Sequence, residues 1–157
     1  MQRFERRLLT RVPGDLTNLI SLSPSIVLVD DDPVYGKMFQ RAAEIKGVSC
    51  TYCQSPREFY RQLGSGFDIA LLDYELGQVT GLQLSRILKL IAPKKFVILT
   101  SAYRSIRYVE EEEDFLKGFI NKTSPALSQV EEVLKIWDRK KGASRHFPPW
   151  ENAPKYR

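Results

Sequence analysis

The chain has 157 residues, of which 43% are hydrophobic and 27% are charged, and its formal net charge at pH 7 is +5. This length and composition are typical of one globular domain with extensions. No apolar run approaches the roughly 18 residues that a membrane-spanning helix needs, and no signal peptide opens the sequence. We therefore expect a cytoplasmic protein with no membrane partner.

The positive charge lies at the two ends of the chain. Residues 1–24 carry a net charge of +2 and residues 138–157 carry +4, whereas the stretch between them carries −1. Basic segments attract anionic surfaces. Because these segments flank the body of the chain, solvated tails are the favoured interpretation, and we expect no direct binding to nucleic acid.

From residue 25 onward, short apolar runs alternate with amphipathic stretches. The runs predict strands over residues 26–29, 48–53, 67–72, 96–99 and 118–120. The amphipathic stretches predict helices over residues 33–46, 56–63, 82–91, 103–113 and 125–137. In the first helix, Asp32 is placed as the cap, and the helical spacing of Val34, Met38, Ala42 and Ile45 predicts the buried face. Five strands with intervening helices predict an α/β fold with a parallel sheet covered on both faces.

Cys50 and Cys53 form a C-x-x-C spacing that also occurs in redox and zinc sites. They fall within a predicted strand, where residues three apart point to opposite faces. The sequence has one histidine and no second cysteine pair to complete a tetrahedral zinc site. We therefore expect two separate reduced thiols.

Polar residues follow the ends of four predicted strands. Asp30 and Asp31 follow the first strand, Asp73 the third, Thr100 the fourth and Lys122 the fifth. The carboxyl ends of parallel strands meet at one edge of a sheet, so these side chains are expected to gather there. Three carboxylates form a site for a hard cation such as Mg²⁺. A carboxylate can also attack phosphorus, which gives an aspartyl-phosphate.

Over residues 25–138 the sequence resembles the receiver domain of two-component response regulators, in a single-domain form similar to the chemotaxis regulator. The resemblance rests on residues 26–33, residues 71–76 with Gly81 following, residues 98–101 and residues 119–122. It implies a flavodoxin-like, doubly wound five-stranded parallel sheet in the order 2-1-3-4-5, flanked by helices. The remaining parts are an N-terminal extension over residues 1–24 and a basic tail, rich in proline and aromatic residues, over residues 139–157.

The resemblance also implies a role for each residue at the strand ends. Asp73 would be the phosphoacceptor, supplied by a histidine kinase or a phosphotransfer protein in a phosphorelay. Mg²⁺ would be held by Asp30, Asp31, Asp73 and the backbone carbonyl of Glu75. Lys122 would pair with the phosphoryl oxygens, Thr100 would hydrogen-bond them, and Phe119 would be the aromatic switch residue that moves with Thr100.

Such a phosphoprotein is not an enzyme beyond self-catalysed phosphorylation and dephosphorylation. It would act on a downstream protein target through protein contacts, and homodimerisation is left open. Two departures from the family pattern concern backbone shape. Gly77 replaces the usual proline after the phosphorylation site, which predicts a looser loop. Thr123 replaces the proline that usually follows the lysine. A cis peptide bond is costly without proline, so the cis bond that is usual in the family is in doubt here.

Two alternatives remain open at this point. Asp30 and Asp32 also fit the D-x-D pattern of haloacid-dehalogenase-like phosphatases, as nucleophile and acid/base. Against this, the predicted helix at Pro33 leaves no room for the flap and cap of that family, and its late acidic motif is missing. The second alternative is a non-phosphorylated pseudo-receiver scaffold, which the intact set of acids argues against.

The flanks give weaker signals. Phe4, Leu8, Leu9 and Val12 have helical spacing and suggest an extra N-terminal helix. The tail mixes proline with aromatic residues in the manner of a docking peptide.

Overall fold

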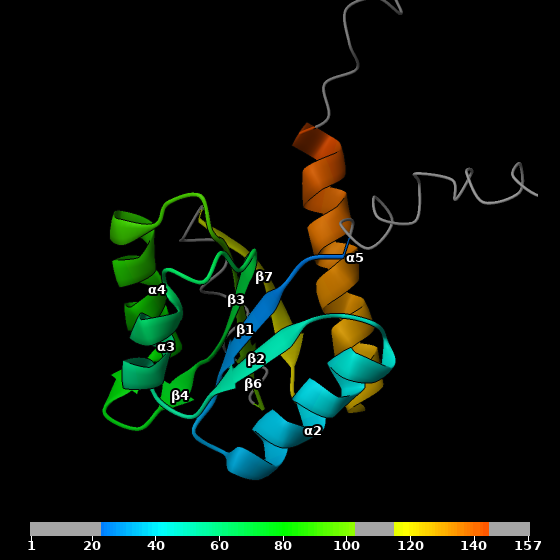
Figure 1. Ribbon diagram of the computed structural model, residues 1–157, viewed down its shortest axis with the longest axis horizontal. Coiled ribbons are helices and arrows are strands. Elements are labelled where there is room, and N and C mark those ends of the chain that lie inside the picture. The colour runs from blue at the N-terminus through cyan, green and yellow to red at the C-terminus, as the bar shows by residue number, and fades with distance from the viewer. Residues whose placement is uncertain (1–22, 103–114, 145–157) are drawn as a thin grey trace, which may run out of the picture.

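A parallel five-stranded sheet lies at the centre of the protein, seen here in a computed structural model that describes residues 23–102 and 115–144 (Figure 1). The strand order is β2-β1-β3-β6-β7. These strands are β1 (Ile26–Val29), β2 (Cys50–Cys53), β3 (Ile69–Asp73), β6 (Phe96–Ser101) and β7 (Leu116–Asn121). The predicted fold class and strand order are confirmed, because these are the five predicted strands in the order 2-1-3-4-5.

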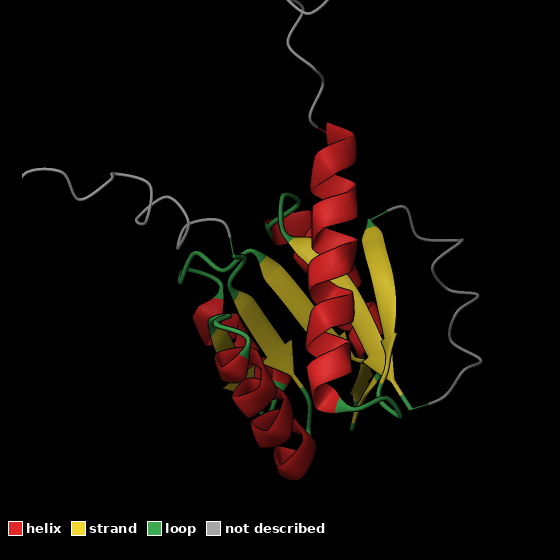
Figure 2. Ribbon diagram, turned by 90° about the vertical axis from the view of Figure 1, so that its right-hand side faces the viewer, coloured by secondary structure: helices red, strands yellow, loops and turns green. Residues whose placement is uncertain are grey.

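Helices cover both faces of the sheet. Helices α2 (Pro33–Ile45) and α5 (Ala126–Ser144) lie on one face, and α3 (Pro56–Gln62) and α4 (Gly81–Ile91) lie on the other (Figure 1). Turned by 90°, the molecule shows α5 running along the sheet and extending past its edge (Figure 2). Among the described residues, no helix combines the length and apolar character that crossing a bilayer requires.

The central strands are buried on both sides, which explains their nearly continuous apolar sequences. Every residue of β1 and β3 is buried. Ile26 and Leu28 face the α2–α5 side, whereas Val27 and Val29 face the α3–α4 side. The sheet therefore separates two hydrophobic cores and holds the strand ends rigidly between them.

The cysteines behave as the strand periodicity predicts. Cys50 packs against the α2–α5 core and Cys53 belongs to the α3–α4 core, and both are free thiols. Burial raises the pKa of Cys50 to about 12 and that of Cys53 to about 11. Because the two thiols lie on opposite sides of the sheet, they do not form a shared zinc site.

The predicted buried face of the first helix is wrong in most of its members. Of that set only Ala42 is buried, while Val34, Met38 and Ile45 are exposed. The helix instead buries Tyr35, Gly36, Phe39, Ala42 and Ala43. Two apolar stripes compete on this helix, and the stripe with two aromatic rings removes more apolar surface from water.

The segment after Asp73 is more regular than predicted. Instead of a loosened loop, β4 (Glu75–Leu76) and β5 (Val79–Thr80) form a short antiparallel hairpin. Gly77 lies in its turn with a φ of 73°, a backbone conformation that proline cannot adopt. Thr80 then caps α4 in a reciprocal capping box with Gln83.

Some predicted features lie outside the described residues. These are the N-terminal helix within residues 1–24, the helix over residues 103–113 and the docking peptide beyond residue 144. The last predicted helix is longer than expected, because α5 continues from Trp137 to Ser144. Among the described peptide bonds, none is cis, so Lys122 and Thr123 are joined in trans.

Gly81 is required where α4 begins against the end of β3. A Cβ added at this position would lie 2.2 Å from the backbone carbonyl oxygen of Asp73. We predict that Gly81→Ala lowers the free energy of unfolding by about 1–3 kcal/mol, because the backbone must shift to relieve the overlap. Urea denaturation followed by circular dichroism measures this change.

Gly64→Ala is the matched control, since no atom of the described residues lies within 4 Å of an added Cβ there. It should leave stability unchanged or raise it by a few tenths of a kcal/mol, to about 1 kcal/mol at most. Equal losses in the two variants would contradict the close approach of α4 to Asp73.

Candidate functional site

The parallel strands bring the predicted polar residues to one edge of the sheet. Asp30 directly follows β1, and Asp73 is the last residue of the neighbouring strand β3. Asp73 pairs in register with Thr100 on β6. Lys122 directly follows β7, and its backbone N–H donates to the carbonyl oxygen of Ser101, 3.0 Å away.

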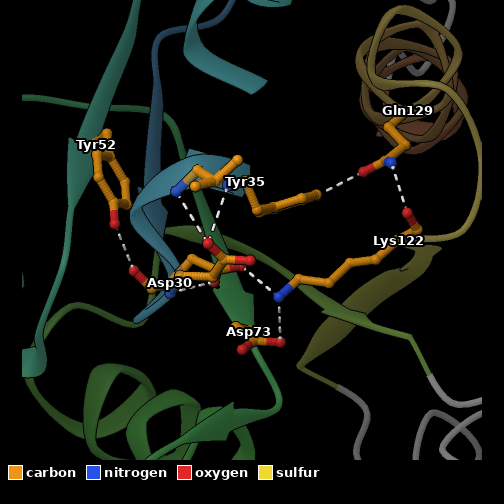
Figure 3. Close-up of polar contacts among 8 residues, drawn as sticks. Asp30, Tyr35, Tyr52, Asp73, Lys122 and Gln129 are labelled. Atoms are coloured by element: carbon orange, nitrogen blue, oxygen red, sulfur yellow. Dashed lines mark hydrogen bonds and ion pairs between the residues drawn. The ribbon is translucent and has the colours of Figure 1, made fainter. Parts of the chain in front are cut away.

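Lys122 joins the two buried carboxylates. Its Nζ lies 2.5 Å from Oδ2 of Asp30 and 3.0 Å from Oδ1 of Asp73 (Figure 3). Asp30 is 0% exposed and Asp73 is 5% exposed, so water screens these charges little. One ammonium group therefore balances two buried carboxylates.

The excess of negative charge changes the titration of both acids. Burial and then the charge of Asp30 raise the pKa of Asp73 to about 6, although Lys122 pulls it down. Burial also raises the pKa of Asp30, against the lowering effect of its hydrogen bond with Lys122. The carboxylates of this site are thus held at an electrostatic cost that a further cation would relieve.

The site has a suitable donor set for such a cation. One carboxylate oxygen from each of Asp30, Asp31 and Asp73 lies within 4.8 Å of the others, and Asp31 is exposed. Oxygen-only ligands with one side open to water suit Mg²⁺, which usually keeps several of its waters. The side chain of Glu75, on β4, is exposed.

The third aspartate of the triplet lies outside this acidic cluster. Oδ1 of Asp32 accepts hydrogen bonds from the backbone N–H groups of Val34 (2.9 Å) and Tyr35 (3.3 Å), which caps α2. Its own N–H donates to Oδ1 of Asp30 at 3.0 Å. The side chain of Asp32 therefore caps α2, and its backbone N–H helps to orient Asp30. A carboxylate engaged in this way does not resemble the free acid/base residue of a phosphatase.

Thr100 and Phe119 occupy different surroundings. Among the described residues, the fully buried Thr100 hydroxyl has no hydrogen bond of acceptable geometry. Burial raises the pKa of the Tyr35 phenol, and the nearby Thr100 hydroxyl offsets only part of that rise. Phe119 is 9% exposed and belongs to the α3–α4 core. Thr100 therefore lies beside the acidic cluster, in register with Asp73, whereas Phe119 lies in the α3–α4 core.

Two side chains at the site were missed by sequence reasoning. Tyr35 on α2 and Gln129 on α5 are hydrogen-bonded to each other and both contact Lys122 (Figure 3). Gln129 stands among the apolar positions of its helix, beside Val130 and Val133. A glutamine at a core position of a helix is a signal that the sequence does contain. It does not identify Tyr35 as the partner, because the two residues are 94 positions apart.

A comparison with family models matches residues 26–135, well over half of the chain, to the family described as response regulator receiver domain. None of the curated proteins compared with the chain matches it.

Solved structures provide the fold comparison. A CheY-like receiver domain protein from Methanospirillum hungatei has 20% identity and a TM-score of 0.66, with 76% of this chain and 98% of that chain covered. A response regulator from Thermotoga maritima has 22% identity, a TM-score of 0.64 and coverages of 73% and 98%. TrrA from the same organism, solved with Mg²⁺–BeF, has 21% identity, a TM-score of 0.63 and coverages of 72% and 98%.

The raised pKa of Asp73 gives a pH-dependent stability in metal-free protein. Between about pH 4 and pH 6 the folded state holds a proton that the unfolded state has released, so stability falls as the pH rises through this window. At pH 7.5 in EDTA, we predict that Asp73→Asn is more stable than the natural sequence by roughly 1–3 kcal/mol. Urea denaturation at several pH values measures the difference, which should shrink toward pH 4. A difference that does not change with pH would contradict this prediction.

Proposed function

Because the chain belongs to the response regulator receiver domain family, we propose that it is a signalling domain that accepts a phosphoryl group on Asp73. The observation that carries this proposal is the shared ion pair of Lys122 with Asp30 and Asp73, beside the open carboxylate of Asp31. A lysine, a cation site and an acceptor carboxylate are the parts that phosphoryl transfer requires.

In the proposed reaction, a carboxylate oxygen of Asp73 attacks the phosphorus of the donor. A P–O bond forms to Asp73 while the bond from phosphorus to the donor's leaving atom breaks, and the leaving group keeps the electron pair. The Lys122 ammonium lies 3.0 Å from Oδ1 of Asp73, which supports a role in pairing with the transferred phosphoryl oxygens. The donor is a histidine kinase or a phosphotransfer protein.

We propose Mg²⁺ as the cofactor, held by Asp30, Asp31, Asp73 and the backbone carbonyl of Glu75. When bound, it neutralises charge on the phosphoryl oxygens. The close spacing of the three carboxylates supports this assignment, and so does the Mg²⁺–BeF complex of the similar protein TrrA. With Mg²⁺ bound, two cations would balance the three carboxylates more evenly than Lys122 does alone.

We further propose that Thr100 and Phe119 carry the conformational switch. The buried Thr100 hydroxyl has no hydrogen-bond partner among the residues that the structure describes, so a phosphoryl oxygen on the paired residue Asp73 would give it an acceptor. Movement of Thr100 would open space for Phe119, and the changed surface would be read by a downstream protein. A cytoplasmic location suits such a relay.

The first test is phosphorylation by a small donor. With acetyl phosphate and Mg²⁺, the intact mass should rise by one phosphoryl group, and Asp73→Asn should abolish the gain because the nucleophile is lost. Intact-protein mass spectrometry at short reaction times measures both results.

Asp32→Asn is the matched control, because asparagine caps helices as well as aspartate does. It should keep the phosphoryl gain. Labelling that survives Asp73→Asn but disappears with Asp30→Asn and Asp32→Asn would favour the phosphatase alternative. If no small donor and no histidine kinase labels the protein, the proposed function is wrong.

Magnesium binding is a separate test. Asp31→Asn should weaken Mg²⁺ binding by on the order of tenfold, because one carboxylate ligand is lost. Isothermal titration calorimetry measures the affinity. Asp138→Asn removes the same charge from the exposed surface of α5 and should leave the affinity unchanged. Absence of binding in the unaltered protein would favour a pseudo-receiver scaffold.

A further inference from the structure

Gln129 is a fully buried polar side chain on the core-facing side of α5. A buried amide is costly unless its donors and acceptor are paired. Its Nε2 donates to the backbone carbonyls of Lys122, at 3.1 Å, and Ser124, at 2.6 Å. Its Oε1 accepts a hydrogen bond from the Tyr35 hydroxyl at 2.5 Å. Gln129 is therefore satisfied entirely by the segment around Lys122 and by Tyr35.

These contacts fix the orientation of the amide. The two backbone carbonyls can only accept, so the NH₂ group of Gln129 must face them and its oxygen must face Tyr35. The Tyr35 hydroxyl then has to be the donor in its bond to Gln129. The direction of each hydrogen bond in this set follows from chemistry and needs no observed hydrogen atom.

The ring of Tyr35 completes the surroundings of the Lys122 ammonium. Nζ of Lys122 lies 4.4 Å from the ring centroid, which is cation–π contact. The other partners of the ammonium are the carboxylates of Asp30 and Asp73. Tyr35 is 7% exposed and packs against Phe39, so its ring is confined within the core.

Lys122 is thus held at both ends by one connected pair (Figure 3). Gln129 fixes its backbone carbonyl, Tyr35 faces its ammonium, and the hydroxyl–amide hydrogen bond joins the two. We propose that Tyr35 and Gln129 are positioning residues that keep the Lys122 ammonium directed at Asp73. This role rests on the proposed function, in which Lys122 must meet the incoming phosphoryl group.

The physical reason for such a pair is the flexibility of lysine. An ammonium on a long side chain has many rotamers, and ordering them costs free energy. A ring face and a fixed backbone restrict the side chain before the donor arrives. Small losses of alignment in a reacting site lower rates strongly.

The direct test is nuclear magnetic resonance of the lysine side chains in metal-free protein. The ring current of Tyr35 should shift the Lys122 methylene protons next to Nζ upfield, and this signal is identified by its loss in Lys122→Met. Tyr35→Leu should abolish the shift, and Gln129→Leu should reduce it, because the ring loses its anchor.

Internal and matched controls are present in the chain. Lys95 lies 4.3 Å from the Phe67 ring centroid, and its shifted signal should not respond to changes at Tyr35. Tyr52→Phe removes a phenol hydrogen bond to the backbone carbonyl of Asp30, at 2.9 Å, without touching Lys122. It should leave the Lys122 shift in place.

The second readout is the rate of phosphorylation by acetyl phosphate at saturating Mg²⁺. Tyr35→Phe keeps the ring and should slow the reaction on the order of tenfold with Mg²⁺ affinity unchanged, as expected for lost positioning. Because the pair acts as a unit, Tyr35→Phe combined with Gln129→Leu should be no slower than the slower single variant.

Two results would overturn the positioning role. One is a Lys122 signal that keeps its shift in Tyr35→Leu, and the other is rate losses that multiply in the double variant. The two arms separate this inference from the proposed function. If the unaltered protein is never phosphorylated, the proposed function fails, and the Lys122 signal alone decides whether the pair positions the lysine.

Discussion

The shared ion pair of Lys122 with Asp30 and Asp73 is the interaction on which the site depends. Both carboxylates are buried, and a buried charge left without a partner costs several kcal/mol. Removing the shared lysine would leave two buried carboxylates unpaired, and such a loss typically costs about 3–5 kcal/mol, which is a large part of the stability of a small domain. We therefore expect Lys122 to matter for the stability of the fold as well as for the proposed phosphoryl transfer. The negative charge that it leaves unbalanced is the property that makes the site receptive to a cation.

The order of the strands explains why a lysine is needed. Asp30 and Asp73 come from the neighbouring strands β1 and β3, but β6 separates β3 from β7, which carries Lys122. Two strand spacings amount to roughly 10 Å, so only a long side chain reaches the carboxylates from that position. It passes the end of β6, where Thr100 lies in register with Asp73. A side chain with this reach needs lateral support, and α2 and α5 provide Tyr35 and Gln129 on the same face of the sheet.

Much of this arrangement could be predicted from sequence because it depends on local patterns. Apolar runs that end in Asp30, Asp73 and Thr100 locate both the strands and the edge where they meet, and Asp32 followed by Pro33 marks a helix start. The buried side of α2 could not be read in the same way. Its two apolar stripes differ by about one residue, and only tertiary packing selects the one with Tyr35 and Phe39. The bond between Tyr35 and Gln129 lies beyond any local pattern, since nothing near either residue specifies the other.

The Thr100 hydroxyl shows how an incomplete site can favour one outcome. Leaving a buried hydroxyl without a good acceptor costs about 1–3 kcal/mol, and the uneven charge of the three carboxylates adds a further cost. The fold tolerates both because the strands that carry them are fixed between two hydrophobic cores. A cation and a phosphoryl group on Asp73 would relieve both costs, since one supplies positive charge and the other supplies an acceptor beside Thr100. The free energy released by satisfying these groups is then available to shift the conformation and would help to drive the proposed switch.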